Sequence, residues 1–174
     1  MMKNLKSNIF TNKIFLIVAL MISFDVLSEK SDKDKPIEIE ADSMTVDDSK
    51  STSIYEGDVI LTQGTLIIKA DTLIVREDKQ GFQHSTSIGK PTTFKQKMEG
   101  SDKFIQGKAL RIEYDGHMDK IHLYKNAEVK RGGDIVVGDY ITYDANAEIA
   151  QAMSNNSSNS GKKSRTKAII KPKD

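Results

Sequence analysis

The feature that most constrains the fold of this chain is an alternation of apolar and polar residues with a period of two. Extended strands place successive side chains on opposite faces, so this period predicts β-strands that each have one apolar face. The clearest stretches are residues 37–41, 44–46, 59–61, 66–68 and 73–75. No stretch from residue 29 onward holds a convincing helical stripe over three turns, and we therefore expect an all-β protein.

The phase of this alternation changes at residue types that turn or bulge a strand at little cost. The changes fall near Asp47, Gly57, Asp58, Gly64 and Asp71. Short strands that follow one another at about ten-residue spacing, with turns between them, are typical of sandwiches and barrels. Residues 59–61 and 66–68 are apolar at both parities. We expect one parity to face an apolar interior and the other to line sheet edges or contacts with a partner.

An internal repeat supports this interpretation. Residues 41–75, shifted by 68 positions, fall on residues 109–143. Identical residues then coincide at Ala41 and Ala109, Asp47 and Asp115, Gly64 and Gly132, Ile67 and Ile135, and Asp71 and Asp139. Apolar positions coincide as well, among them Val46 with Tyr114 and Leu73 with Ile141. The repeat predicts two similar meanders stacked in one domain, with a solenoid-like character.

The first 28 residues have the composition of a secretory signal peptide. Three lysines precede the nine apolar residues 14–22, a run about half as long as a bilayer span requires. Val26 and Ser28 are small enough for a cleavage site, so we expect export and a mature chain that begins at Glu29. An uncleaved membrane anchor is the alternative. The chain has no cysteine, which excludes a lipoprotein, disulfides and thiol catalysis.

The segments after the leader differ in composition, and we interpret them as four parts. The parts are a disordered lead-in at 29–35, a β-structured body at 36–153, a flexible Ser/Asn-rich loop at 154–161 and a basic segment at 162–174. In the last part, Ala168, Ile169 and Ile170 predict a final strand within 165–172 that meets a neighbouring protomer or another partner protein. A disordered basic tail is the alternative.

Charge and motifs favour a binding function over catalysis. The chain has 26 basic and 25 acidic residues, and removal of three lysines and one aspartate with the leader leaves 23 and 24. This balance gives no reason to expect a nucleic-acid partner. His84, His117 and His122 lie in unrelated contexts without metal-ligand spacing, and no nucleophile or phosphate-loop motif occurs. We expect no catalytic residue, metal or cofactor; an enzyme acting on envelope glycans is the weakest alternative.

A set of short motifs carries a family resemblance. They are Ile37 to Asp42, Tyr55 to Gly64, Ile68 to Asp71, Gly89 to Phe94, Gly107 to Ala109 and Gly138 to Tyr143. In this order and spacing, over about residues 36–172, they resemble the OstA-like (LptA-type) domain family of periplasmic lipopolysaccharide-transport proteins. The Ser/Asn-rich loop and the abrupt C-terminus depart from that family's pattern and leave the shape of the last strand open.

The resemblance implies a fold, a task and partners. The fold would be an elongated, slightly twisted antiparallel β-jelly roll of about sixteen strands with an open apolar groove. Protomers would stack end to end in the periplasm of a Gram-negative bacterium and pass lipopolysaccharide, held by its lipid A portion, along the groove. One end of the bridge would meet LptC of the inner-membrane complex, and the other would meet the N-terminal domain of LptD at the outer membrane.

Four residues are the candidate lipopolysaccharide-binding positions. Ile37 and Val46 lie on apolar parities of the first meander, Phe94 follows the Gly-Lys-Pro turn, and Tyr114 is the repeat partner of Val46. The plainer interpretation is that each is an ordinary core residue. A structural or adhesive β-repeat protein with a packed interior and no ligand is the runner-up function, because the repeat and the absence of catalytic motifs fit it equally well.

Overall fold

The computed structural model describes residues 32–79, 81–98, 100–144, 147, 149–154 and 165–172, without the side chains of 81–83. These residues form two short 3₁₀ helices and ten strands. The elements are η1 (Asp32–Asp34), β1 (Glu38–Glu40), β2 (Ser43–Asp47), η2 (Asp48–Lys50), β3 (Thr52–Gln63), β4 (Leu66–Asp78), β5 (Gly81–Lys97), β6 (Phe104–Asp115), β7 (Lys120–Arg131), β8 (Asp134–Asp144), β9 (Ile149–Met153) and β10 (Lys167–Ile169).

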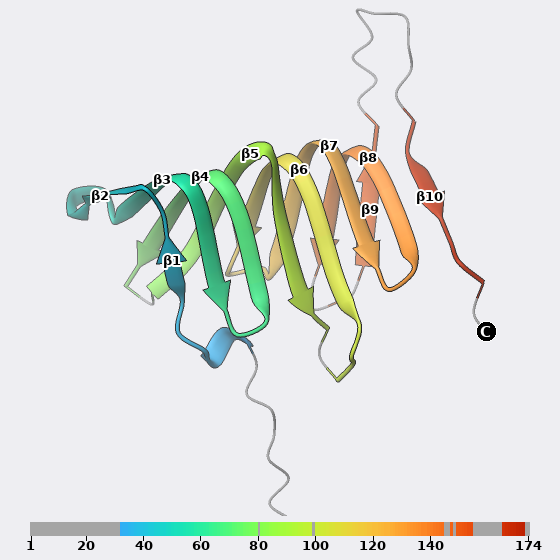
Figure 1. Cartoon of the computed structure of the whole chain (residues 1–174), viewed down its shortest axis with the longest axis horizontal. Helices are drawn as coiled ribbons and strands as arrows, with labels where there is room; N and C mark the ends of the chain where they lie inside the picture. The colour runs from blue at the N-terminus through green and yellow to red at the C-terminus, as the bar shows by residue number, and fades with distance from the viewer. Residues whose placement is uncertain are drawn as a thin grey trace, which may run out of the picture.

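All ten strands belong to one antiparallel sheet, which confirms the expected all-β class. Strands β3 to β8 form a meander in which each strand pairs with its neighbours in sequence. The short strands complete the two ends: β1 and β2 both pair with β3, and β9 and β10 both pair with β8. The strands lie side by side along the longest axis of the molecule, and the sheet is not closed into a barrel (Figure 1).

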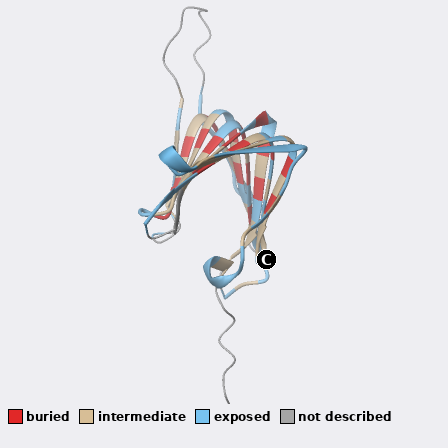
Figure 2. Cartoon of the chain, turned by 90° about the vertical axis from the view of Figure 1, so that its left-hand side faces the viewer, coloured by how far each residue is buried: buried red, intermediate tan, exposed pale blue. Residues whose placement is uncertain are grey.

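Every long strand is interrupted at the same level of the sheet. The pairing register shifts between Glu56 and Val59, Lys69 and Thr72, Ile88 and Thr92, Lys108 and Arg111, and Tyr124 and Ala127. These interruptions are aligned from strand to strand, and we call them the bend row. Figure 2 shows the consequence: the sheet folds over along this row into an arch whose two halves face each other.

Left-handed backbone conformations explain the bend at both ends of the row. Gly57 and Asp58 have φ values of 83° and 42°, and Lys125 and Asn126 have φ values of 63° and 53°. Extra residues in these conformations form bulges, which bend a strand and increase its twist. The phase changes at Gly57, Asp58 and Asp71 therefore mark bulges inside long strands, where the sequence pattern alone also allowed turns between short ones.

The bend row divides the sheet into two walls. The first wall comprises residues 43–56, 72–79, 81–88, 111–124, 140–144 and 149–153, and the second comprises 38–40, 59–70, 92–98, 100–109, 127–138 and 167–169. The expected count of about sixteen strands is not confirmed, since the described residues form ten. The six long strands cross the bend without ending. Each of them contributes one segment to each wall, which accounts for the difference from the expected number.

The apolar core lies between the walls. One cluster contains Val59, Leu61, Ala70, Leu73 and Val75 from β3 and β4. The other contains Phe94, Ile105, Ala109, Ile112, Leu123, Ala127, Val129, Ile141 and Tyr143 from β5 to β8. Since both clusters combine residues of the two walls, burial of these side chains stabilises the arch as well as the sheet.

The structure also bears on the expected segments at the two ends. Residues 1–28 and 29–31 lie outside the described residues, as does 155–164, which includes nearly all of the Ser/Asn-rich loop. Within the expected disordered lead-in, residues 32–34 instead form η1, whose side chains bond to the body of the sheet. The expected final strand is present as β10, and it pairs with residues 135–137 of its own chain.

No helix among the described residues has the length and apolar character that crossing a membrane would require.

Close packing at Gly107 generates a testable prediction about stability. A Cβ atom at this position would lie 2.1 Å from Cε1 of the buried Phe94 ring. We expect Gly107→Ala to lower the free energy of unfolding by about 1–3 kcal/mol, because the ring must leave its packed position. Chemical denaturation measures the change, and a Phe94→Leu background should remove most of it.

Gly133→Ala is the matched control for this substitution. The atoms nearest to a Cβ atom there belong to the flexible side chain of Lys171. We expect little loss of stability in this variant, and an equal loss in both variants would contradict the packing argument.

Candidate functional site

The candidate binding surface is the inner face of the two walls. In an antiparallel sheet, directly paired residues point to the same face. On the first wall one continuous row of such pairs crosses eight strands, through Val46, Ser53, Val75, Ser85, Tyr114, Ile121, Tyr143 and Ala150. Val75, Ser85 and Tyr143 in this row are buried, so the row faces inward. Val46 and Tyr114 thus lie in the same inward row, as the sequence repeat predicted.

A second inward row crosses the second wall. Its members are Ile39, Leu61, Ile68, Phe94, Gly107, Val129, Val136 and Ala168. The Phe94 side chain is 3% exposed, and its ring covers Gly107, which has no side chain to exclude it. Ile37 lies two residues before Ile39 and packs against the β3–β4 cluster. All four residues proposed from the sequence therefore contribute to the inner face, although they do not meet at one point.

The inner face is largely apolar, and at the β2 end its side chains are exposed. Met44 is 61% and Val46 51% exposed, although their pairing partners on β3 belong to the inward face. Leu73, Leu123 and Ile141, farther along the sheet, are completely buried. The interior therefore continues to the β2 end of the molecule, where a second apolar surface could extend it.

Small polar side chains interrupt the apolar surface at β5. Ser85 and Ser87 are buried between the inward residues of β4 and those of β6. Thr92 is also buried, and its hydroxyl donates to the Lys69 carbonyl oxygen at 3.0 Å. Because serine is small, the interior at β5 has less side-chain volume than at the neighbouring strands. The alternation of apolar residues gave no signal of these inward hydroxyls.

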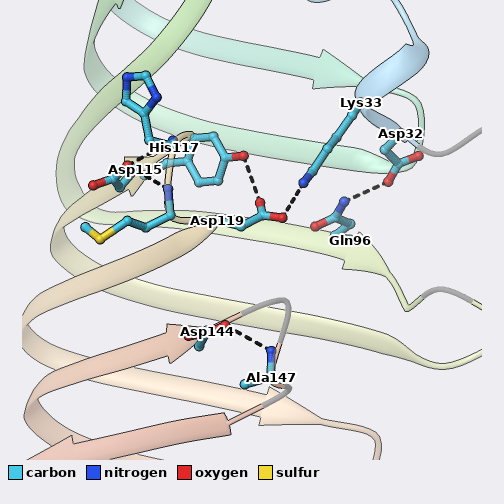
Figure 3. A network of polar contacts seen from close by, with 10 residues as sticks. Asp32, Lys33, Gln96, Asp115, His117, Asp119, Asp144 and Ala147 are labelled. Carbon is cyan, nitrogen blue, oxygen red and sulfur yellow. Dashed lines mark hydrogen bonds and ion pairs between the residues drawn. The ribbon is translucent and has the colours of Figure 1, made fainter.

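A polar network spans the open side of the arch, opposite the bend. Asp32 of η1 accepts hydrogen bonds from the Thr65 backbone nitrogen at 2.7 Å, from its hydroxyl at 2.6 Å, and from Gln96 Nε2 at 2.9 Å. Lys33 forms an ion pair with Asp119, whose other oxygen accepts from the Tyr114 hydroxyl at 3.0 Å (Figure 3). Thr65 and Gln96 belong to the free rim of the second wall, and Asp119 belongs to the rim of the first.

Two groups in this network have displaced pKa values. Burial alone would raise the pKa of Asp32, but the hydrogen bonds from Thr65 and Gln96 and the charge of Lys35 outweigh it and lower the pKa below 3.8. Burial and the Asp119 carboxylate raise the pKa of Tyr114 well above its usual value of 10.0. The Tyr114 hydroxyl therefore stays protonated at any physiological pH and can donate its hydrogen bond to Asp119. Sequence patterns did not reveal this network, because its partners are up to 86 residues apart.

The histidines lie on the rim and outer surface of the first wall. The rings of His84 and His117 are 5.7 Å apart, near Asp115 and Asp78. His122 Nδ1 lies 2.6 Å from the Tyr140 hydroxyl on the outer face. In the part of the chain that the structure describes, no group of three or more metal-ligating side chains could hold a metal ion.

Comparisons with known proteins point to one family. Residues 38–149 match the family model described as LptA/(LptD N-terminal domain) LPS transport protein. The lipopolysaccharide export system protein LptH of Pseudomonas aeruginosa is 32% identical over 140 residues, which cover 80% of each chain. The lipopolysaccharide export system protein LptA of Escherichia coli K12 is 33% identical over 151 residues, 83% of this chain and 81% of its own.

A solved structure agrees with these relatives. The crystal structure of LptH, described as the LptA homologous periplasmic component of the lipopolysaccharide transport device of Pseudomonas aeruginosa, superposes with a TM-score of 0.74. The two chains are 30% identical, and the match covers 82% of this chain and all of the other.

The pKa of Asp32 generates a prediction about pH dependence. A carboxylate whose pKa is lower in the folded state stabilises the fold above its unfolded pKa, and this contribution disappears as the pH falls through the folded value. We expect Asp32→Asn to lower the free energy of unfolding by about 1 kcal/mol near neutral pH. The difference from the unsubstituted protein should shrink below about pH 4. Denaturation series at several pH values measure it.

Asp34→Asn serves as the control, because it removes the same charge from the same helix at an exposed position. We expect its effect on stability to be small. If the difference between Asp32→Asn and the unsubstituted protein is the same at pH 3 as at pH 7, the hydrogen bonds to the Asp32 carboxylate do not stabilise the fold.

Proposed function

The chain belongs to the LptA/LptD N-terminal domain family of lipopolysaccharide transport proteins, and on that premise we propose that it carries lipopolysaccharide between the walls of its arch. The acyl chains of the lipid A portion lie against the inward rows of the two walls. The sugars extend through the open side opposite the bend. Ile37, Val46, Phe94 and Tyr114 are the proposed contact residues.

The observation that carries the proposal is the continuity of the inner face. Inward rows cross eight strands on each wall without a charged residue, and apolar side chains of the first wall remain exposed at the β2 end. A packed globular core would enclose these residues. An unclosed sheet with an apolar inner face suits a ligand that is itself long and apolar.

The free energy of transferring acyl chains into water explains why such a ligand needs an apolar surface. Transfer of acyl chains into water costs about 0.8 kcal/mol per methylene, or roughly 9 kcal/mol for a chain of about twelve carbons. Lipid A carries several chains, so free diffusion through water is prohibitively slow. A continuous apolar surface removes this barrier by solvation alone and requires no catalytic group.

We propose that the partners bind at the two ends of the sheet. The outer edges of β1 and β2 at one end and of β9 and β10 at the other carry no further strand among the described residues. Unpaired edges add strands from another chain. In this proposal one end meets LptC of the inner-membrane complex, the other meets the N-terminal domain of LptD, and copies of this chain stack end to end between them in the periplasm. The leader at 1–28 directs export and is removed.

The structure also contains an observation that favours the runner-up, a structural β-repeat protein without ligand. Leu73, Leu123 and Ile141 are completely buried, which is what a fully packed interior requires. Binding of purified protein to lipopolysaccharide separates the two functions, because an adhesive or structural repeat would not bind it.

Photo-crosslinking tests the inward assignment. A photoreactive phenylalanine analogue replaces Ile37, Val46, Phe94 or Tyr114 in turn, and cells are irradiated. Because these positions belong to the inner face, we expect adducts with lipopolysaccharide at each of them, detected as shifted bands by immunoblotting.

Thr45 and Glu38 provide the matched controls. Thr45 adjoins Val46 but pairs with Ile54 on the outward parity, and Glu38 precedes the inward Ile39. Analogues at these two positions should give little adduct. Equal labelling at inward and outward positions would show that the lipid does not lie between the walls.

Truncation after Gly161 tests the role of the basic segment in assembly. It removes β10, so residues 135–137 of β8 keep their pairing with β7 but lose the strand on their other edge. We expect the shortened protein to remain folded, because neither core cluster includes a residue beyond 161. Its assembly should be poor. Light scattering over a concentration series should show growing open-ended species for the intact chain and mostly monomer for the truncated one.

A charge variant separates strand pairing from electrostatic steering. Lys167→Ala with Lys171→Ala retains the strand and removes two of its cations. We expect this variant to assemble but with weaker dependence on salt than the intact chain. If the truncated protein assembles as well as the intact one, the basic segment has no part in the end-to-end contact.

A further inference from the structure

We propose that residues 32–35 form a strap that closes the open side of the arch and must leave one wall before lipid enters laterally. This inference rests on the proposed function, since it concerns how the same interior is loaded. The strap comprises η1 and Lys35, and it lies across the open side, between the rims of the two walls (Figures 2 and 3).

One end of the strap is held firmly on the second wall. Asp32 accepts three hydrogen bonds, two from Thr65 at the β3–β4 turn and one from Gln96 on β5. Gln63 Nε2 donates to the carbonyl oxygens of Lys33 at 3.3 Å and Lys35 at 3.1 Å. These bonds fix both the side chain of Asp32 and the backbone of the strap. The strap is therefore attached to the second wall at several points.

The contact with the first wall is of a different kind. It includes the ion pair between Lys33 and Asp119, in the turn between β6 and β7. The Lys33 side chain is 63% exposed, whereas that of Asp119 is 11% exposed. The Tyr114 hydroxyl bonds to the other oxygen of Asp119 and orients the carboxylate toward the strap. The Asp119 carboxylate is thus held in place, and the long, solvated side chain of Lys33 reaches it.

The inequality of the two attachments determines which one opens. An ion pair with a largely exposed partner contributes little to stability, because water and salt solvate the separated charges well. The multipoint contact with the second wall is the stronger of the two. The strap therefore releases Asp119 first and remains on the second wall, and η1, which buries none of its residues, loses no apolar packing when it moves.

The consequence for function concerns the path of the ligand. Acyl chains enter between the walls either through an end of the sheet or through the open side. The strap crosses the open side beside Tyr114, one of the proposed contact residues, and in its closed position it restricts lateral loading. Release of Lys33 removes that restriction and leaves the two walls otherwise unchanged.

The absence of native cysteine allows a direct test. In the full mature chain, Lys33→Cys and Asp119→Cys are introduced together and joined by a reducible bis-thiosulfonate crosslinker, which holds the strap on the first wall. The probe is fluorescently labelled lipopolysaccharide, and the readout is its association rate. We expect the crosslinked protein to load about tenfold more slowly than the same protein after reduction.

The control carries Lys33→Cys with Thr65→Cys and the same crosslinker. This pair joins the strap only to the second wall, where it already rests, so reduction should not alter the association rate. Lys33→Ala without any crosslinker removes the ion pair and should load about twofold to fivefold faster than the unsubstituted protein.

The outcomes separate the two proposals. Equal loading of the crosslinked and reduced Lys33→Cys, Asp119→Cys protein would show that lipid enters only through the ends and would overturn the strap, while binding by both forms would leave the proposed function intact. If the unsubstituted protein does not bind labelled lipopolysaccharide at all, both proposals fail.

Discussion

The structure depends on the alignment of its bulges. A flat antiparallel sheet of ten strands would expose one apolar face to water, and a single bulge would bend only its own strand. Here the register shifts of β3 to β8 occur at the same level, so the whole sheet folds along one line and the apolar faces of the two halves meet. Both core clusters and the strap across the open side are consequences of this alignment.

In the proposed function, the fold along the bend row lets one sheet form both sides of the surface that binds a long apolar ligand. A closed barrel has a fixed interior, whereas an arch can vary the separation of its walls by small changes at one line of residues. Several residues at this line are polar, as at Asp58, Asp71 and Asn126, whereas Ala70 and Ala109 at the same line belong to the core clusters. Because both clusters combine residues of the two walls, a change in the separation of the walls requires the clusters to repack.

The sequence pattern predicted local features such as strands, but it did not predict contacts between residues that are far apart in the chain. Alternation identified the strands, and the repeat correctly related Val46 to Tyr114: both lie in one inward row, and Gly64 and Gly132 occupy equivalent turns with φ of 60°. It did not distinguish a bulge from a turn at Gly57, because both use the same residue types. It also missed Lys33 and Asp119, since an ion pair between positions so far apart leaves no periodic signal, and a short acidic and basic segment resembles a disordered one.

The meander order of the strands has a consequence for how the chain acquires its structure. Each of the hairpins from β3 to β8 joins strands that are consecutive in sequence, so pairing requires closure of short loops only. The strands from β3 to β8 can therefore pair one at a time in sequence order. The contact between Lys33 and Asp119 joins a residue before β1 to one in the turn between β6 and β7, 86 positions later in the chain. It cannot form until β6 is in place, which makes closure of the strap a late step that reports on the completion of the preceding hairpins.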